Sequence, residues 1–207
     1  MLELGVKTLL AYFLGAILGS LVLGRLRKVD IRTLGSGNAG GTNALRTQGV
    51  AFGLAVLAID IAKGVIAVLV LPPLRLPGIG IDPAVSREWL QMCCAAAVIV
   101  GHVYPIWFDF RGGKGAATVV GVVTALHPWT LLPLLATWLL VLLLTGFVGL
   151  ATMLAGVALV LVVWWRTPQD TPFLLFSIAT ALFIIFTHRS NISRMLAGTE
   201  NRARRLW

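Results

Sequence analysis

Apolar residues fill most of this chain in long runs, and short polar segments separate the runs. They lie at about 4–24, 49–72, 89–106, 114–127, 129–146, 148–165 and 171–187. A helix needs ~20 apolar residues to cross the ~30 Å hydrocarbon layer of a bilayer, and several runs approach that length. The pattern therefore predicts an all-α, polytopic integral membrane protein with about seven transmembrane helices, in a single domain over residues 1–207.

The stretch 114–146 fits either one over-long helix or two short ones, and His127-Pro128-Trp129 interrupts it. A residue before proline is pushed away from the α region, and proline suits the first turn of a new helix. We therefore predict two helices. A single crossing would also place the arginines of the C-terminal tail outside, although basic residues favour cytoplasmic loops.

Seven spans with the N-terminus outside place twelve of the seventeen Lys and Arg residues in cytoplasmic segments. These are Arg25, Arg27, Lys28, Arg32, Arg46, Arg111, Lys114, Arg189, Arg194, Arg202, Arg204 and Arg205. On the outer side fall Lys7, Arg75, Arg87 and Arg166. The charge distribution thus predicts an outer N-terminus and a cytoplasmic C-terminus. The first run lacks a basic n-region and a cleavage site, so we expect a retained span rather than a signal peptide.

Composition agrees with lipid as the solvent. Hydrophobic residues make up 58% of the chain and charged residues 12%, about half the charged share of a soluble domain. The net charge of +9 does not predict a nucleic-acid partner, because the basic residues lie between apolar runs rather than on one soluble face. Cys93 and Cys94 are adjacent in an apolar run and indicate no disulfide framework. No His/Cys cluster predicts a metal site.

The first cytoplasmic segment, 25–48, contains the sequence LGSGNAGGTN. Its glycines, which allow positive φ and close approach of a ligand to backbone N–H groups, are Gly35, Gly37, Gly40 and Gly41. Side-chain donors are added by Ser36, Asn38, Thr42 and Asn43. Arg46 adds a fork suited to phosphate. The segment predicts an anion cradle, while a plain loop or helix cap remains the alternative.

The second segment, 107–115, contains Arg111-Gly112-Gly113-Lys114-Gly115 before an apolar run. It is not a nucleotide-binding P-loop, because that motif needs G-x-x-x-x-G-K-[ST] between a strand and a helix. Glycine N–H groups beside a lysine at a helix N-terminus still favour an anion. Simple positive-inside anchoring by Arg111 and Lys114 is the alternative.

Other polar residues have structural and functional interpretations side by side. In the third segment, 188–207, His188 fits a polar helix end at the interface, although a base or an anion donor is also possible. Asp60 and Lys63 share one helix face, and a neutralised pair that positions the helix is favoured over chemistry. For His102, helix–helix hydrogen bonding is at least as well supported as catalysis.

Four motifs together resemble the bacterial acyl-phosphate:glycerol-3-phosphate acyltransferases, the PlsY-type family. They are GSGNAGGTN (35–43) followed by Arg46, DIAKG (60–64), GHVYPIWFDFRGGKGAAT (101–118) and HRSNISRMLAGTE (188–200). The resemblance implies a seven-helix enzyme of the bacterial inner membrane, with its active site facing the cytoplasm. Such an enzyme moves a fatty acyl group from acyl phosphate to the 1-hydroxyl of sn-glycerol 3-phosphate. The products are lysophosphatidic acid and phosphate, in the first acylation of phospholipid biosynthesis. It implies no cofactor, no metal and no obligate protein partner.

The resemblance also implies roles for individual residues. The acyl-phosphate subsite would comprise Gly35, Ser36, Gly37, Asn38, Thr42 and Asn43. The glycerol-3-phosphate subsite would comprise Arg46, Lys114 and His188. The catalytic residues would be Ser36, Lys114, His188 and Asn191. Supporting residues would be Asp60, Lys63, His102, Gly112, Gly113, Thr152, Arg194 and Glu200. One departure is that family members often read VSLAS where this chain has Gly149 and Thr152. A serine hydroxyl is therefore missing at 149, although Thr152 could supply a donor nearby.

The residues favour direct transfer over an acyl-enzyme. A serine nucleophile needs a base that a third group orients, and Ser36 has no obvious histidine of that kind. The H-x-x-x-x-D signature of another acyltransferase class is absent, because Trp107, Leu132 and Ser193 follow the three histidines at that spacing. The rival function is a transporter for an organic phosphate or other small anion. A non-catalytic membrane scaffold would leave the three polar segments unexplained.

Overall fold

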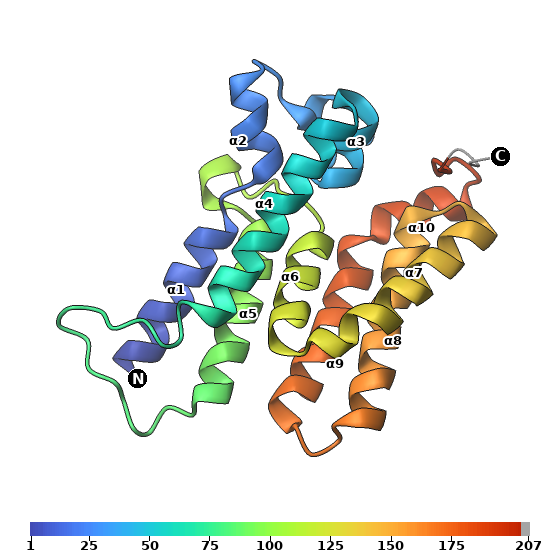
Figure 1. Cartoon of the computed structure of the whole chain (residues 1–207). Coiled ribbons are helices and arrows are strands. Elements are labelled where there is room, and N and C mark those ends of the chain that lie inside the picture. The colour runs from blue at the N-terminus through green and yellow to red at the C-terminus, as the bar shows by residue number, and fades with distance from the viewer. Residues whose placement is uncertain (204–207) are drawn as a thin grey trace. The chain divides into compact units, whose positions relative to one another are not determined.

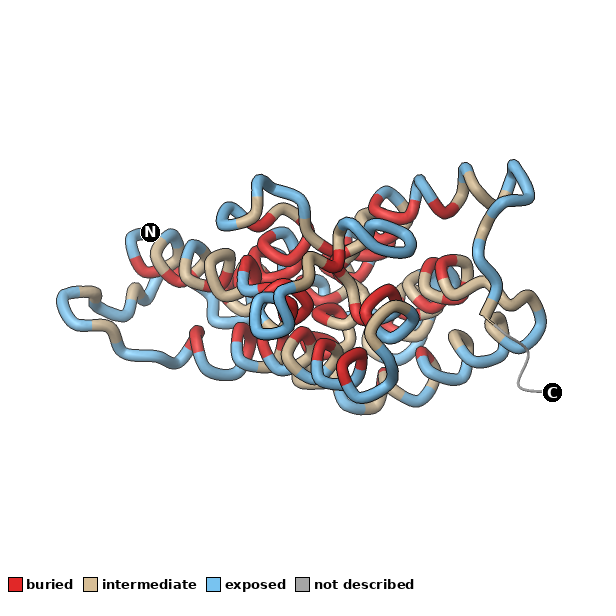
Figure 2. Tube along the Cα trace, turned by 90° about the horizontal axis from the view of Figure 1, so that it is seen from above, coloured by how far each residue is buried: buried red, intermediate tan, exposed pale blue. Residues whose placement is uncertain are grey.

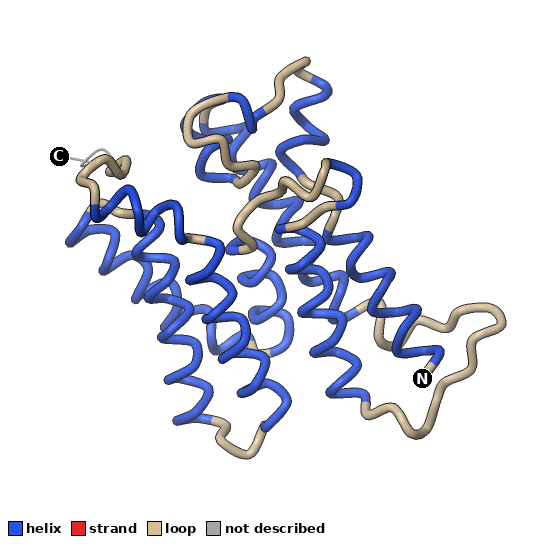
Figure 3. Tube along the Cα trace, turned by 180° about the vertical axis from the view of Figure 1, so that it is seen from behind, coloured by secondary structure: helices blue, strands red, loops and turns tan. Residues whose placement is uncertain are grey.

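The computed structural model describes residues 1–203, and in that range the regular structure is helical (Figure 3). Two compact units divide the chain, Met1–Leu126 and a second unit that begins at His127. Arg204 and Arg205, which the charge pattern assigned to the cytoplasmic side, lie outside the described residues.

The first unit contains six α-helices and two short 3-10 helices (Figure 1). In chain order they are α1 (Leu2–Gly15), α2 (Gly19–Leu26), η1 (Ile31–Thr33), α3 (Gly41–Gln48), α4 (Val50–Leu69), α5 (Arg87–Val103), η2 (Ile106–Phe108) and α6 (Ala116–Leu126). The second unit contains η3 (Pro128–Thr130), α7 (Leu131–Thr145), α8 (Val148–Arg166), α9 (Thr171–Thr187) and α10 (Arg189–Leu196).

Four helical stretches in the described range are long and apolar enough to cross a membrane: Val50–Leu69, Arg87–Phe108, Pro128–Thr145 and Val148–Arg166. The number rises to six if each of two bent pairs, α1 with α2 and α9 with α10, is one span. The short apolar helix α6 has 11 residues, about 16 Å at 1.5 Å per residue. The all-helical class is therefore confirmed, whereas the count of seven spans stays a prediction.

The interruption at His127 is confirmed, because α6 ends at Leu126 and α7 begins after η3. Other details differ from the sequence pattern. The apolar run 4–24 is broken between Gly15 and Gly19 and bends by 45°, whereas α4 runs unbroken past Asp60. The break had no strong sequence signal, since Ala16-Ile17-Leu18 is as apolar as its surroundings.

Glycines set the close helix contacts of the first unit. A Cβ on Gly101 of α5 would lie 2.1 Å from the Tyr12 carbonyl oxygen of α1, and one on Gly121 of α6 would lie 2.1 Å from the Ile61 carbonyl oxygen of α4. Small residues let helix backbones approach in this way inside membranes. On α4 the buried positions form one stripe, including Val56, Asp60 and Lys63. Figure 2 marks the buried residues of the helices in red and the exposed residues in pale blue. The exposed apolar face then suits lipid.

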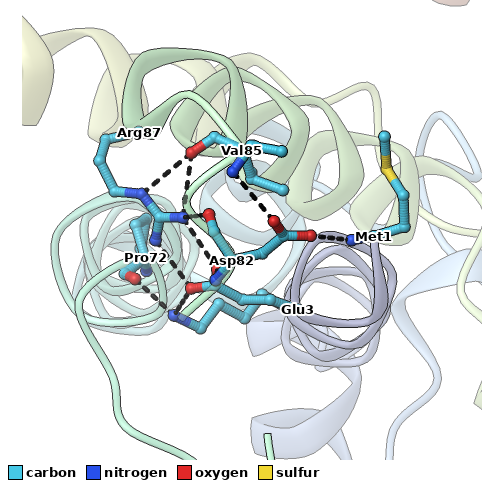
Figure 4. Close-up of polar contacts among 8 residues, drawn as sticks. Met1, Glu3, Pro72, Asp82, Val85 and Arg87 are labelled. Carbon is cyan, nitrogen blue, oxygen red and sulfur yellow. Dashed lines mark hydrogen bonds and ion pairs between the residues drawn. The ribbon is translucent and has the colours of Figure 1, made fainter. Parts of the chain in front are cut away.

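A polar cluster of Glu3, Lys7, Asp82 and Arg87 lies at one end of the first unit (Figure 4). Arg87 donates two hydrogen bonds to the Glu3 carboxylate, at 2.7 and 2.8 Å. Lys7 bonds Glu3 at 2.8 Å and the Pro72 carbonyl at the end of α4. Lys7, which the charge pattern assigned to the outer side, is a buried residue of α1.

In the second unit α8 packs against α7 and α9. The C-terminal tail returns to the turn between α7 and α8, where the Ala203 N–H donates to the Gly146 carbonyl at 2.8 Å. The Arg202 guanidinium also stacks over the Phe147 ring. These contacts bring the tail next to the start of α8.

Candidate active site

The glycine loop, residues 34–40, connects η1 to α3 and is organised by one buried side chain. The Asn43 amide nitrogen donates to the carbonyls of Ile31, Leu34 and Asn38 at 2.9–3.1 Å. Its amide oxygen accepts the Ser36 N–H at 2.9 Å. A Cβ at position 35 would lie 2.4 Å from that oxygen. The loop is thus folded around Asn43, which requires glycine at 35.

Positive φ angles at Gly35 and Gly37, +56° and +73°, give the loop its tight path. The loop leads directly into α3, whose first N–H groups have no partner within the helix and carry partial positive charge. Ser36, Thr42 and Arg46 are exposed at this end. A preformed loop, a helix N-terminus and a guanidinium together suit an anion.

The second glycine segment, residues 111–115, runs back along the end of α5. The Gly112 and Gly113 N–H groups donate to the Val103 and His102 carbonyls, each at 3.1 Å. A Cβ on Gly113 would lie 2.1 Å from Nε2 of His102, so only glycine fits over that ring. Lys114 follows, half-buried, at the start of α6. The glycines thus allow the segment to pass close to the end of α5.

Phe108 of η2 joins the two glycine segments in the first unit. Its ring packs against the cluster of Leu18, Leu21 and Ala39, and Ala39 lies in the glycine loop. Its carbonyl accepts a hydrogen bond from Arg32 at 3.1 Å. Both segments therefore lie at the same end of this unit, as the sequence predicted for 25–48 and 107–115.

Arg32 is itself fixed by Asp30, the residue that caps η1. The guanidinium donates from Nε and a terminal nitrogen to the two carboxylate oxygens, at 3.1 and 2.8 Å. These hydrogen bonds from Arg32 hold the pKa of Asp30 below its ordinary value. The Asp30–Arg32 pair therefore orients the guanidinium that bonds the Phe108 carbonyl, next to the glycine loop.

The predicted pair of Asp60 and Lys63 is present, with Nζ 3.0 Å from Oδ1 and both side chains buried. His102 lies beside it, with Nδ1 3.5 Å from the same oxygen. A histidine next to a carboxylate thus exists in this chain, contrary to the impression from sequence. Its Nε2 is covered by Gly113, which argues against His102 as a base for Ser36.

In the second unit His188 lies at the bend between α9 and α10. Its Nδ1 is 2.8 Å from the Ile184 carbonyl, and because a carbonyl only accepts, Nδ1 carries a hydrogen. In the neutral ring Nε2 then holds the lone pair. The side chain is buried, so the helix bend fixes both its tautomer and its orientation.

Asn191 lies one turn further on and belongs to a three-residue network. Its amide donates to Glu200 Oε1 at 2.7 Å, and Arg194 donates to Glu200 Oε2 at 2.6 Å. A Cβ on Gly149 of α8 would lie 2.9 Å from Asn191 Cγ and 3.0 Å from its Cβ. The glycine at 149 therefore makes room for Asn191 in this chain.

The Thr152 hydroxyl, a candidate substitute for the missing serine hydroxyl at 149, already has two partners within the second unit. It donates to the Val148 carbonyl at 2.9 Å and accepts from the Trp138 indole at 3.2 Å.

The sequence pattern did not indicate two residues that contact the glycine loop, Ser20 and Phe108. Ser20 bonds the Ala39 carbonyl of the glycine loop at 2.6 Å, and its signal was a hydroxyl inside an apolar run.

The site residues carry mostly cationic, hydroxyl and amide side chains, which suits phosphate esters. Through residue 203, no three His, Cys, Asp or Glu side chains are grouped as metal ligands. The fold and these segments define a helical protein with apolar candidate spans and with glycine-rich, basic segments at its helix ends.

Comparison with known proteins identifies the family. Residues 6–198 match the family described as glycerol-3-phosphate acyltransferase. Curated glycerol-3-phosphate acyltransferases are 42% identical in Thermoanaerobacter pseudethanolicus and 40% identical in Thermosynechococcus vestitus. These alignments cover 94% and 96% of this chain, and 92% and 94% of the relatives. The chain belongs to the glycerol-3-phosphate acyltransferase family.

Two solved structures share the fold. Both are of PlsY (YgiH), an integral membrane glycerol 3-phosphate acyltransferase, one in its glycerol 3-phosphate form and one in its lysophosphatidic acid form. Their TM-scores are 0.82 and 0.80, with 34% identity over 96% of this chain and 94% of theirs. The resemblance to the PlsY-type family is thus confirmed.

Proposed function

We propose that this protein is a membrane acyltransferase that moves a fatty acyl group from acyl phosphate to the 1-hydroxyl of sn-glycerol 3-phosphate. The products are lysophosphatidic acid and inorganic phosphate. The proposal rests on the similarity of nearly the whole chain to the two PlsY structures, one in a glycerol 3-phosphate form and one in a lysophosphatidic acid form. These two molecules are the acceptor and the product of one acylation.

An acyl phosphate donor agrees with the first unit. That unit has two glycine segments beside cationic side chains, and the reaction needs to hold two phosphate groups. We assign the donor phosphate to the glycine loop, with Ser36, Asn38 and Thr42 as donors. Asn43 contributes through its hydrogen bonds to that loop. Arg46, Lys114 and His188 are assigned to glycerol phosphate, and Asn191 to the reacting group.

The proposed chemistry is direct transfer. The 1-hydroxyl oxygen attacks the acyl carbonyl carbon, the bond from that carbon to the phosphate oxygen breaks, and phosphate departs. A substrate phosphate oxygen takes the hydroxyl proton. Oriented N–H donors and cations stabilise the developing oxyanion and the leaving phosphate. Ser36 binds phosphate in this scheme and is not acylated.

Trapping tests the role of Ser36. In a single turnover with labelled acyl phosphate and no acceptor, the protein should remain unlabelled after denaturation. A Ser36→Ala variant should retain measurable transfer with a raised KM for acyl phosphate. Recovery of an acylated peptide containing Ser36 would contradict direct transfer.

The proposed location is the bacterial inner membrane, with an outer N-terminus and the active site facing the cytoplasm. The concentration of basic residues in 25–48, 107–115 and 188–207 supports this orientation. Single cysteines introduced at Lys28 and Gly80, tested for labelling by an impermeant thiol reagent in whole cells, check it. Labelling at 80 and protection at 28 is the expected pattern.

Transport of an organic phosphate is the competing function. Purified protein in proteoliposomes should convert glycerol 3-phosphate to lysophosphatidic acid when acyl phosphate is supplied, and acyl-CoA should not replace the donor. Uptake of glycerol 3-phosphate without any acylated product would instead support the transporter.

A further inference from the structure

We propose that the buried Asp60–Lys63 pair is a positioning device that fixes both glycine segments of the first unit. It acts through the break between α1 and α2 on one side and through His102 on the other. The inference rests on the proposed function, because those two segments are the assigned phosphate sites. Asp60 and Lys63 are positioning residues and do not touch substrate.

Lys63 supplies the partners that the broken helix lacks. Its ammonium group lies 2.8 Å from the Gly15 carbonyl, 2.9 Å from the Ile17 carbonyl and 3.0 Å from Asp60. An ammonium has three donors, so these three contacts use them all. Carbonyls at the end of a helix otherwise have no intrahelical partner. Lys63 thereby stabilises the 45° bend after α1.

Asp60 holds the other side of the break. Its Oδ1 accepts the Gly19 N–H at 3.3 Å, at the start of α2. The next residue, Ser20, donates to the Ala39 carbonyl in the glycine loop at 2.6 Å. Both side chains are buried. The direction of α2, which Asp60 fixes, therefore determines where Ser20 holds the loop.

The connection to the second glycine segment passes through His102. Its imidazole lies between Asp60, 3.5 Å from Nδ1, and Gly113, which packs against Nε2. The His102 carbonyl also accepts the Gly113 N–H at 3.1 Å. Lys114 follows directly. A rotation of the His102 ring would therefore displace the segment that carries Lys114.

The cluster of Glu3 and Lys7 provides a matched comparison. It is also a buried pair on one helix of the first unit, at 2.8 Å. Its partners are Pro72, which lies just after the end of α4, and Arg87, the first residue of α5. These helix ends are opposite to the ends that adjoin the glycine segments. If buried pairs in this unit act only on stability, then removing either pair should have the same kinetic effect.

The experiment compares Asp60→Asn, Lys63→Met, the double variant and the control Lys7→Met, purified in detergent. Thermal stability and kinetics for both substrates are measured for each. Removing one partner of a buried pair leaves an uncompensated charge, whereas removing both is often tolerated. The double variant should therefore regain much of the stability that the single variants lose.

The kinetics of the double variant decide the proposal. Without Lys63 the carbonyls of Gly15 and Ile17 lose their donor, so both phosphate loops shift. We expect kcat/KM to fall by at least about tenfold for both substrates, on the scale of small misplacements in active sites. Lys7→Met should lose stability yet keep near wild-type kinetics. Recovery of both stability and kinetics in the double variant contradicts the positioning role.

Two further comparisons separate this inference from the proposed function. Lysophosphatidic acid formation by the wild type and its loss in Arg46→Ala test the site assignment. Normal kinetics in the double variant beside a defective Arg46→Ala variant overturn the positioning role alone. If the double variant does not fold, Ser20→Ala interrupts the same connection. It should raise KM for acyl phosphate more than about threefold, by the typical worth of one hydrogen bond, and an unchanged KM contradicts the proposal.

Discussion

The Asn43 amide oxygen accepts the Ser36 N–H at 2.9 Å, so a helix residue seven positions on fixes the most exposed part of the glycine loop. The same side chain donates to three carbonyls before and within the loop. Its two amide hydrogens are shared among the three carbonyls, and its oxygen accepts one hydrogen bond. The loop therefore has its shape before any substrate arrives, which reduces the ordering cost of binding.

Replacing Asn43 should disrupt that shape. Asn43→Ala removes the donor from the buried Ile31 carbonyl and from two partly buried carbonyls. The loss should cost roughly 1–3 kcal/mol of unfolding free energy and lower kcat/KM at least about tenfold. Thermal unfolding and steady-state kinetics in detergent measure both. Gln48→Ala in the same helix is the control. Full activity of Asn43→Ala would show that the loop does not need this organiser.

The cationic side chains of Arg46 and Lys114, assigned to the glycerol-3-phosphate subsite, should affect KM for that substrate. Arg46→Ala and Lys114→Ala each remove a charged hydrogen-bond donor worth roughly 1.5–3 kcal/mol, so KM for glycerol 3-phosphate should rise at least about tenfold. Arg27→Ala is the control, since Arg27 lies in the same basic segment but stacks over Phe52. Wild-type kinetics in either test variant would remove that residue from the subsite.

Gly149 should resist the serine that relatives often carry. A side chain at 149 would meet Asn191 at 2.9–3.0 Å, tighter than ordinary contact, and would push its amide away from Glu200. Gly149→Ser should therefore reduce kcat at least about tenfold. Gly156→Ala in the same helix is the control, because the added Cβ finds its nearest neighbour at 3.6 Å. Equal activity of the two variants would show that Asn191 tolerates displacement.

Acid should weaken one loop connection. Hydrogen bonds from Arg32 lower the pKa of Asp30 below 3.8, so the native protein holds the carboxylate form more strongly than the unfolded chain does. The pair stabilises above that value and loses its effect as pH falls through the native pKa. Because the pair is partly exposed, its worth is at most ~1 kcal/mol. The unfolding temperature of the wild type should lie slightly above that of Asp30→Asn at about pH 7, and the gap should narrow as the pH falls below 3.8. A gap that persists at low pH contradicts this origin.

The sequence predicted the features that follow from local chemistry. Proline at 128 marked the break before α7, and the glycines at 35 and 37 adopt the positive φ that their loop needs. Asp60 and Lys63 could be paired from their spacing alone.

Long-range contacts could not be predicted in this way. The carbonyls at the break at 16–18 accept hydrogen bonds from Lys63, which lies 48 positions from Gly15. Asn43 was assigned to phosphate, but its contacts with the loop backbone depend on how η1 and α3 meet. The room for Asn191 at Gly149 likewise depends on the packing of α10 on α8. Periodicity along one helix contains no record of these partners.

Product stoichiometry is the most direct test of acyl transfer from acyl phosphate to glycerol 3-phosphate. Purified protein is incubated with acyl phosphate and labelled glycerol 3-phosphate, and lysophosphatidic acid and inorganic phosphate are quantified together. Acyl transfer predicts equal molar amounts of lysophosphatidic acid and inorganic phosphate. Their formation should depend on both substrates and be strongly reduced in Lys114→Ala. Phosphate release without lysophosphatidic acid, or no reaction with acyl phosphate, would contradict it.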